Sequence, residues 1–226
     1  MPENHALLLN KKFVLKSPAP WKVKGEAIFL IFKFKKTWVA ESGLLPKHLK
    51  GKFKGGLGYV FLGNYTDTPV GKYHELLFVP GKFRKTKRQA ITKNFVDSEA
   101  STQNGRENWG FPRETLPMKW LTNKNFDSLC VEKNGAPIFS AEFESKGFSF
   151  PISTSFFSIR LCQTWNKFKY YTRPAGSGWG KFLNIKRLDV NPDFFPDIRH
   201  IKPILAIKVS RFQMRYPEAK YHDDFI

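Results

Sequence analysis

The residues best suited to chemistry lie in two short segments, YHE at residues 73–75 and GRENWGFPRE at residues 105–114. Glu75 is a carboxylate in an otherwise apolar stretch and has the chemistry of a general base. Arg113 carries a planar guanidinium that stays charged and can hold a carboxylate or enolate through two parallel hydrogen bonds. Whether these two side chains meet depends on the elements that carry them.

Other common active-site motifs are missing from the sequence. The five histidines are scattered, and none has the paired spacing of a zinc site. The two cysteines, Cys130 and Cys162, are too few for a disulfide scaffold or a four-cysteine zinc site. The sequence also lacks a phosphate-binding loop, a dinucleotide fingerprint and a catalytic-triad order. We therefore expect neither a metal nor a cofactor.

Short aromatic and β-branched segments, separated by Gly, Pro, Asn or Asp, predict a mainly β fold. The Asn134-Gly135 pair lies between two such segments and predicts a hairpin. Because exposed strand edges are a liability, we expect the strands to close into a barrel, cone or sandwich. The expected strands are residues 27–35, 58–65, 72–79, 90–96, 127–132, 137–144, 155–163, 168–172, 180–190 and 204–216.

The sequence predicts a single domain with little helix. No long stretch carries a clean helical stripe, and residues 44–49 are the best candidate for a short helix. In the absence of repeats and low-complexity linkers, one domain is expected over residues 1–226, with an N-terminal extension (1–17) and a C-terminal tail (217–226). Apolar runs too short for a membrane span or a signal peptide predict a cytoplasmic protein.

Four segments, taken in order, resemble the acetoacetate decarboxylase-like superfamily. They are PAPWKVKG (18–25), TPVGKYHE (68–75), FVDSEAS (95–101) and GRENWGFPRE (105–114). Their order is more specific than any one of them, and the resemblance runs from about residue 18 to residue 190. It implies a β-cone or double-barrel fold with a few short helices, whose interior holds a small carbonyl compound.

At the positions of the family's catalytic lysines, this sequence differs from the decarboxylating members. Decarboxylating members carry a lysine directly after the proline of the last segment and a second lysine next to it. Here Arg113 and Glu114 stand at these positions. A Schiff base needs an amine that is neutral part of the time, and a guanidinium does not lose its proton. Decarboxylases also use an acidic residue on the preceding strand and an arginine at the start of the first long strand. The matching positions here are Val60 and a position near Gly25, so neither polar group is expected. We therefore expect a member that lacks the Schiff-base lysine.

Glu75, Arg113 and Glu114 are the catalytic candidates that the resemblance leaves. In one interpretation, Arg113 clamps an anionic ligand and Glu75 acts as its base. In the other, Arg113 and Glu75 or Glu114 only neutralise each other as a buried pair.

Residues beside these candidates are expected to contact the ligand or to support the site. Arg113 and the aromatic residues Tyr73, Trp109 and Phe111 are the ligand-binding candidates. Arg106 and Glu107 are expected to form a structural ion pair that braces a loop, because charges near a tight Gly-rich turn need local partners.

The leading functional hypothesis is a small-molecule-binding protein, or a cofactor-free enzyme of lyase, isomerase or cyclase type in specialised metabolism. Its partner would have an apolar body and an anionic or carbonyl end. The sequence does not separate binding from catalysis and leaves open whether the chain forms homo-oligomers.

A strongly basic composition supports an alternative function. Lys and Arg total 38 against 19 Asp and Glu, a formal charge of +19, with clusters at residues 47–54 and 82–88. Such a field attracts polyanions. The alternative is therefore a degenerate fold member that binds nucleic acid or an acidic lipid surface, although no nucleic-acid-binding signature accompanies the clusters.

Overall fold

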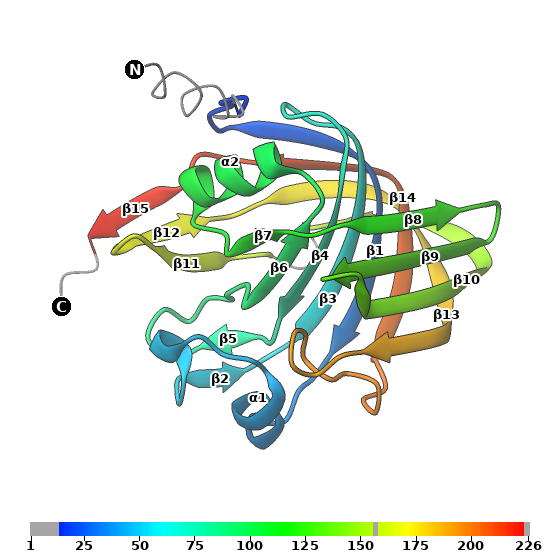
Figure 1. The fold of residues 1–226 in the computed structure, drawn as a ribbon, viewed down its shortest axis with the longest axis horizontal. Coiled ribbons are helices and arrows are strands. Elements are labelled where there is room, and N and C mark those ends of the chain that lie inside the picture. The colour runs from blue at the N-terminus through cyan, green and yellow to red at the C-terminus, as the bar shows by residue number, and fades with distance from the viewer. Residues whose placement is uncertain (1–13, 156–157, 224–226) are drawn as a thin grey trace, which may run out of the picture.

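A ten-stranded sheet dominates the computed structural model, which describes residues 14–155 and 158–223 (Figure 1). The predicted mainly β fold is confirmed. The strands, in chain order, are β1 (Trp21–Phe32), β3 (Gly58–Asp67), β4 (Tyr73–Val79), β6 (Lys93–Val96), β7 (Arg113–Thr115), β8 (Met118–Thr122), β9 (Phe126–Lys133), β10 (Ala136–Ser153), β13 (Ala175–Val190) and β14 (Leu205–Tyr216).

The order across this sheet is β7-β6-β4-β3-β1-β14-β13-β10-β9-β8. Every neighbouring pair is antiparallel except β6 and β7, which run parallel. The predicted hairpin joins β9 to β10, with Asn134 and Gly135 at φ values of 53° and 77° as a tight turn of this kind requires. The sheet curls so that β8, β9 and β10 fold over its central strands (Figure 1).

Two smaller sheets complete the β structure. One has the order β11 (Leu161–Trp165), β12 (Phe168–Thr172), β15 (Lys220–Asp223), and the other pairs β2 (Phe53–Gly55) with β5 (Lys82–Phe83). Part of the expected C-terminal tail is thus a strand of the domain. In the expected N-terminal extension, Ser17 is also fixed, because its amide donates to Asn104 Oδ1 at 2.7 Å.

The described residues form two α-helices, α1 (Lys36–Ser42) and α2 (Glu99–Trp109), with a 3-10 turn over Lys47–Leu49 inside the expected short helix. The sequence analysis did not identify α2. The Ser98 side chain accepts a hydrogen bond from the Ser101 amide at 3.2 Å, which caps the start of the helix. Gly110, at φ 65°, ends it in the left-handed conformation that glycine adopts easily. Within the described residues, no helix is long and apolar enough to cross a membrane.

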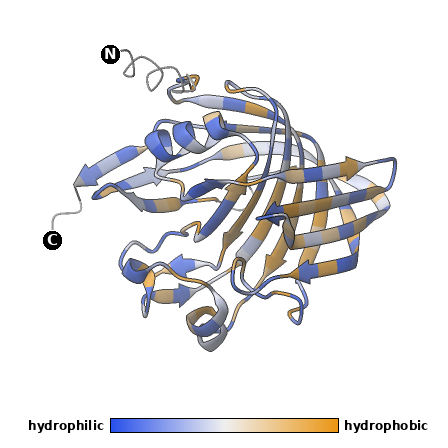
Figure 2. Cartoon of the chain, viewed as in Figure 1, coloured by the Kyte–Doolittle hydropathy of each residue, from blue (hydrophilic) through white to orange (hydrophobic). Residues whose placement is uncertain are grey.

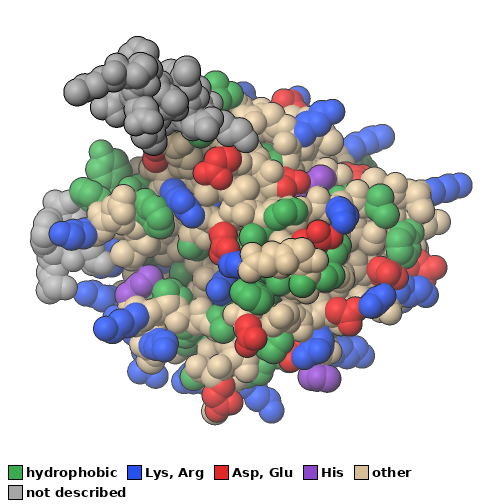
Figure 3. Space-filling model, viewed as in Figure 1, with side chains coloured by type: hydrophobic (Ala, Val, Ile, Leu, Met, Phe, Trp, Pro, Cys, Tyr) green, Lys and Arg blue, Asp and Glu red, His purple; other side chains and the backbone are tan. Residues whose placement is uncertain are grey.

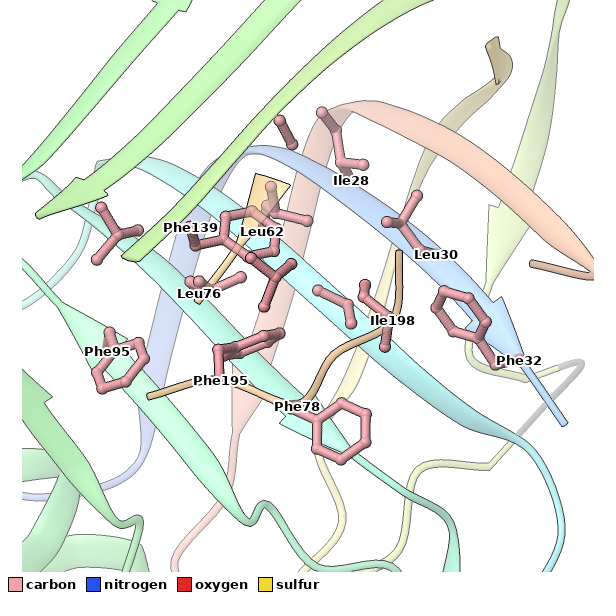
Figure 4. Packing of buried hydrophobic residues seen from close by; sticks show 14 of the residues in the cluster. Ile28, Leu30, Phe32, Leu62, Leu76, Phe78, Phe95, Phe139, Phe195 and Ile198 are labelled. Carbon is pink, nitrogen blue, oxygen red and sulfur yellow. The ribbon is translucent and has the colours of Figure 1, made fainter. Parts of the chain in front are cut away.

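The central strands are buried on both faces, which explains their continuous apolar sequences (Figure 2). On one face of β3 and β4, Leu62, Leu76 and Phe78 pack with Phe195 inside the curl of the sheet (Figure 4). On the opposite face, the alternate residues contribute to a second apolar cluster that includes Tyr65, Tyr73, Leu77 and Trp109. Glu75 is on this second face, because side chains alternate along a strand.

Candidate functional site

Glu75 and Arg113 form an ion pair in the second cluster. Arg113 Nη2 donates to Glu75 Oε1 at 3.1 Å, and the two side chains are 2% and 1% exposed. Glu75 lies on β4 and Arg113 at the start of β7, and β6 lies between these strands. The sheet therefore brings together two charges that are 38 residues apart in sequence.

Helix α2 holds the other side of the guanidinium. Arg113 Nη1 donates to both the backbone oxygen and Oγ of Ser101, each at 2.9 Å. Gly105, one turn further along, leaves room for the side chain, since a Cβ there would lie 2.5 Å from Arg113 Nη1. Although burial alone lowers the pKa of Arg113, the neighbouring Tyr73 and Glu75 raise it above its usual value. The guanidinium is therefore permanently charged.

Tyrosines surround the carboxylate of Glu75. Tyr65 donates its hydroxyl proton to Glu75 Oε2 at 2.8 Å and lies 3.4 Å from the Tyr216 hydroxyl. Tyr73 is 3.5 Å from Arg113 Nη2, with its ring 5.6 Å from the guanidinium carbon. Burial, reinforced by Glu75, raises the pKa of Tyr65 and Tyr216, so both hydroxyls remain protonated at neutral pH. The cluster therefore holds a paired carboxylate and guanidinium, Glu75 and Arg113, surrounded by neutral tyrosine hydroxyls.

The expected aromatic residues Tyr73, Trp109 and Phe111 are all buried, but they have different partners. Phe111 packs 5.5 Å from the Arg113 guanidinium and lines a small cavity beside Glu75. Trp109 instead packs edge-on against Trp21, with ring centroids 5.1 Å apart, and donates its indole proton to Pro217 O at 2.7 Å. Trp109 thus joins α2 to the start of β1 and the end of β14, which are paired strands, whereas Phe111 and Tyr73 reach the charged pair.

Glu114 points away from the other catalytic candidates. It is half-exposed and forms an ion pair with Lys133 at 2.6 Å on the opposite face of β7. Neighbouring residues in a strand face opposite sides, so Glu114 cannot share a site with Arg113. The alternative of a pair between these two residues fails for the same reason.

The expected pair of Arg106 and Glu107 is also absent from the ion pairs of the described residues. Both lie on α2 and face different neighbours. Arg106 donates to the backbone oxygen of Arg113 and stacks on Trp165, while Glu107 accepts from Gln103 at 3.1 Å. Arg106 therefore braces the site through the backbone of β7 and not through an ion pair.

Two neighbouring cavities on the Glu75 side of the sheet share a wall. The inner cavity, about 30 Å³, is lined by Glu75 and Phe111 and has room for one or two water molecules. The outer cavity has a volume of about 740 Å³. Phe29, Tyr59 and Ile159 line both cavities and thus form the wall between them.

Sequence reasoning missed the residues that complete the cluster, namely Tyr65, Ser101, Gly105 and Tyr216. Alternation along β3 and β4 could have placed Tyr65 on the face of Glu75. No sequence signal connects Tyr216 to the site, because it lies at the end of β14, which comes last in the chain among the strands of the large sheet. Among the residues that the structure describes, no three His, Cys, Asp or Glu side chains gather as a metal site.

A curled ten-stranded sheet, with an ion pair buried against one face and a ligand-sized cavity on that same side, defines a β-cone protein. The chain belongs to the acetoacetate decarboxylase family, whose sequence model matches residues 10–182. The resemblance seen in the sequence is thereby confirmed at the level of the family. A search of curated protein sequences gave no significant match.

Solved structures of the same fold include an acetoacetate decarboxylase from Legionella pneumophila. It has a TM-score of 0.67 and 14% identity, with 92% of this chain and 89% of that one covered. An acetoacetate decarboxylase-like enzyme from Sphingomonas wittichii RW1 has a TM-score of 0.60 and 11% identity, with coverage of 92% and 94%. The enduracididine biosynthesis enzyme MppR, complexed with pyruvate, has a TM-score of 0.59 and 14% identity, with coverage of 94% and 93%. At these identities, the similarity establishes the fold alone.

Proposed function

We propose that this chain binds an apolar carbonyl or carboxylate compound in the outer cavity, on the Glu75 face of the sheet, as a binding protein or a cofactor-free enzyme, without forming a Schiff base at position 113. The observation that carries the proposal is the outer cavity. Its volume of about 740 Å³ lies within the range of roughly 300–1,000 Å³ typical of small-molecule sites, and it shares a wall with the inner cavity that Glu75 lines. The MppR complex with pyruvate supports a small carbonyl ligand.

The chemistry of the buried pair supports the exclusion of an imine. The nucleophile of a Schiff-base mechanism must present a neutral amine, whereas the contacts of Arg113 hold its guanidinium charged. The Arg113 guanidinium donates hydrogen bonds to Glu75, Ser101 and Tyr73. It does not line the inner cavity. We assign Arg113 the role of a positioning residue that pairs with the Glu75 side chain and orients it.

Glu75 and Tyr59 are the groups that a ligand would meet at the inner end. Glu75 lines the inner cavity and accepts from both Tyr65 and Arg113. Burial, with a further contribution from Glu75, raises the pKa of Tyr59, so its hydroxyl is a neutral donor for a carbonyl oxygen. A ligand carbonyl at Tyr59 would bring its α-proton towards the Glu75 carboxylate. Glu75 would then orient or deprotonate the ligand.

Reductive trapping tests the absence of the imine. The protein is incubated with acetoacetate or with pyruvate, treated with borohydride, and analysed by intact mass and peptide mapping. We expect no decarboxylation of acetoacetate and no adduct. Arg113→Lys supplies an amine at the same position and is the matched comparison. A stoichiometric adduct on any lysine of the unaltered protein would refute this part of the proposal.

Binding of the fluorescent apolar probe N-phenyl-1-naphthylamine tests the cavity. We expect saturable binding that is lost in Leu57→Trp, because Leu57 lines the outer cavity and a larger side chain there would occupy it. Leu121→Trp is the control, since Leu121 is also an exposed leucine but lies on β8, away from the two cavities. Equal binding by both variants would place the probe elsewhere.

The basic exterior gives less support to the alternative of a nucleic-acid or lipid-surface module. On the face seen in Figure 3, Lys and Arg side chains are spread around the periphery, with Asp and Glu between them. A phosphate-driven interaction would weaken steeply between low and physiological salt, whereas binding of an uncharged probe in the cavity would not. Salt titration therefore distinguishes the two functions.

A further inference from the structure

The outer cavity has three cations on its wall and no acidic side chain. Lys82, Lys87 and Arg160 line it together with apolar residues such as Ile31 and Leu205. We propose that the ligand carries an anionic group, a carboxylate or a phosphate, which these three cations bind at the outer cavity while its apolar body points inwards to Tyr59. This inference rests on the proposed function and adds the charge and the orientation of the ligand.

The backbone fixes the place of the three cations. Lys82 and Gln89 are opposite residues of an antiparallel bridge, and the Gln89 amide donates to Arg160 O at 2.9 Å. Segments 82, 89 and 160 thus lie side by side. Lys87 is in the turn that joins the first two, where its amide donates to Phe83 O at 2.9 Å. Lys87 adopts a φ of 55°, a left-handed conformation unusual for a lysine.

These cations have no carboxylate partner among the described residues. Other lysines of the protein do, as in the pairs Lys119–Glu132 at 2.7 Å and Lys186–Glu144 at 2.9 Å. Within the described part of the chain, the Arg160 side chain donates to Ser158 Oγ at 3.3 Å and to no carboxylate. Three positive charges without a carboxylate partner, beside an apolar wall, create a local potential that favours an anion.

A buried amide adds a polar group to the same wall. Gln89 is 9% exposed and lines the outer cavity, where its Nε2 donates to Leu57 O at 3.3 Å. Its Oε1 is buried and has no hydrogen-bond partner. Buried polar atoms are nearly always satisfied, so this oxygen is an acceptor for a donor brought by a ligand or by water.

Charge also sets the direction of the ligand. The inner cavity is lined by the Glu75 carboxylate but not by Arg113, so an anion that entered first would approach a negative charge. The outer cavity presents the opposite sign. An amphipathic anion therefore has one favourable orientation, with its uncharged end at Phe29, Tyr59 and Ile159.

Displacement of N-phenyl-1-naphthylamine by three compounds with the same ten-carbon chain tests the proposal. Decan-1-ol is neutral, and decanoate and decyl phosphate carry the two anionic groups. A net hydrogen bond to a charged group corresponds to about a tenfold change in affinity, so we expect at least one anion to displace the probe at about tenfold or more lower concentration than decanol. The better of the two anions identifies the group as a carboxylate or a phosphate.

Two triple variants with the same change in net charge locate the effect. Lys82→Gln/Lys87→Gln/Arg160→Gln should remove the preference for the anion and leave decanol unchanged. Lys54→Gln/Arg84→Gln/Lys85→Gln changes basic residues of the same region that do not line the outer cavity, and it should keep the preference. Equal loss in both variants would assign the preference to the overall field and overturn the proposal.

The outcomes separate this inference from the proposed function. If neither the probe nor decanol binds, the cavity itself is not a site and the proposed function fails. If all three compounds bind equally to the unaltered protein, the cavity is a binding site as proposed, but the inference that its ligand carries an anionic group is refuted. Loss of the preference only in the variant of the three lining cations confirms the inference.

Discussion

Replacing Arg113 with methionine should destabilise the fold far more than the loss of a surface charge would. The change removes the hydrogen bonds to Glu75, Ser101 and Tyr73 and leaves the Glu75 carboxylate, 1% exposed, without a cation. Breaking one partner of a buried pair costs about 3–5 kcal/mol. For a chain of this size, each kcal/mol shifts the melting temperature by about 2–4 °C, so the expected fall is about 6–20 °C.

A double-mutant cycle shows how much of this cost comes from the pair itself. Glu75→Gln alone leaves the guanidinium buried, with Ser101 and Tyr73 as its remaining partners. The double variant Glu75→Gln/Arg113→Met removes both charges, so it should be more stable than the sum of the two losses implies, by about 2 kcal/mol. Urea unfolding followed by tryptophan fluorescence measures each free energy, because Trp21 and Trp109 are buried beside the cluster.

The control is Glu114→Gln, which breaks the ion pair with Lys133 on the opposite face of β7. That pair is partly exposed, so its loss should cost less than about 1 kcal/mol. The reasoning is refuted if Arg113→Met costs no more than Glu114→Gln. It is also refuted if the two single changes at Glu75 and Arg113 add to within about 0.5 kcal/mol, since that would mean the charges do not interact.

Three further predictions follow from other features of the molecule. Gly105→Ala should destabilise the fold by about 1 kcal/mol or more, although alanine favours a helix by about that amount, because its Cβ would collide with Arg113; a rise in urea midpoint would contradict this packing. Folding raises the pKa of four tyrosines, three buried and one partly buried, above the unfolded value of about 10, so their stabilising effect is complete below that pH and is lost as the pH rises further. Near-ultraviolet absorbance should show them ionising only with alkaline unfolding, and a normal titration in the folded state would show that they are accessible; they are Tyr59, Tyr65, Tyr73 and Tyr216. Neutralising the basic residues of segment 82–88 together should leave the melting temperature unchanged or higher, because exposed like charges contribute little to stability, and a large fall would show that they are paired; they are Lys82, Arg84, Lys85, Lys87 and Arg88.

The strands were predictable because their residues alternate and their turns carry distinctive residues. The Asn134-Gly135 turn is the clearest case, since its positive φ angles suit these two residues. Helix α2 was not predictable from an apolar stripe. Its buried residues include Ser101, Thr102 and Asn104, which face polar partners such as the Arg113 guanidinium and the backbone of residue 15. The cap residues Ser98 and Gly110 were the available signals, and they are weak on their own.

The site was predictable only in part. The resemblance to a family brought Glu75 and Arg113 together, whereas no spacing in the sequence connects β4 with β7. Alternation in β7 could have excluded Glu114 once the strand was known. The sequence did not reveal which basic side chains of segment 82–88 line the outer cavity and which do not. Which of its side chains line the outer cavity depends on the turn at Lys87, and a single sequence does not reveal that conformation.

The contact between Tyr65 and Tyr216 has a consequence for how the protein is made. These hydroxyls are 151 residues apart in sequence, and Trp109 and Pro217 are separated by 108. During translation, the ribosome releases β3, β4, α2 and β7 long before β14. Until β14 emerges, the nascent chain carries Glu75 and Arg113 beside an open apolar surface. Pairing over such long separations is slow, so this stage of biosynthesis is where the chain is most exposed to aggregation and most dependent on chaperones.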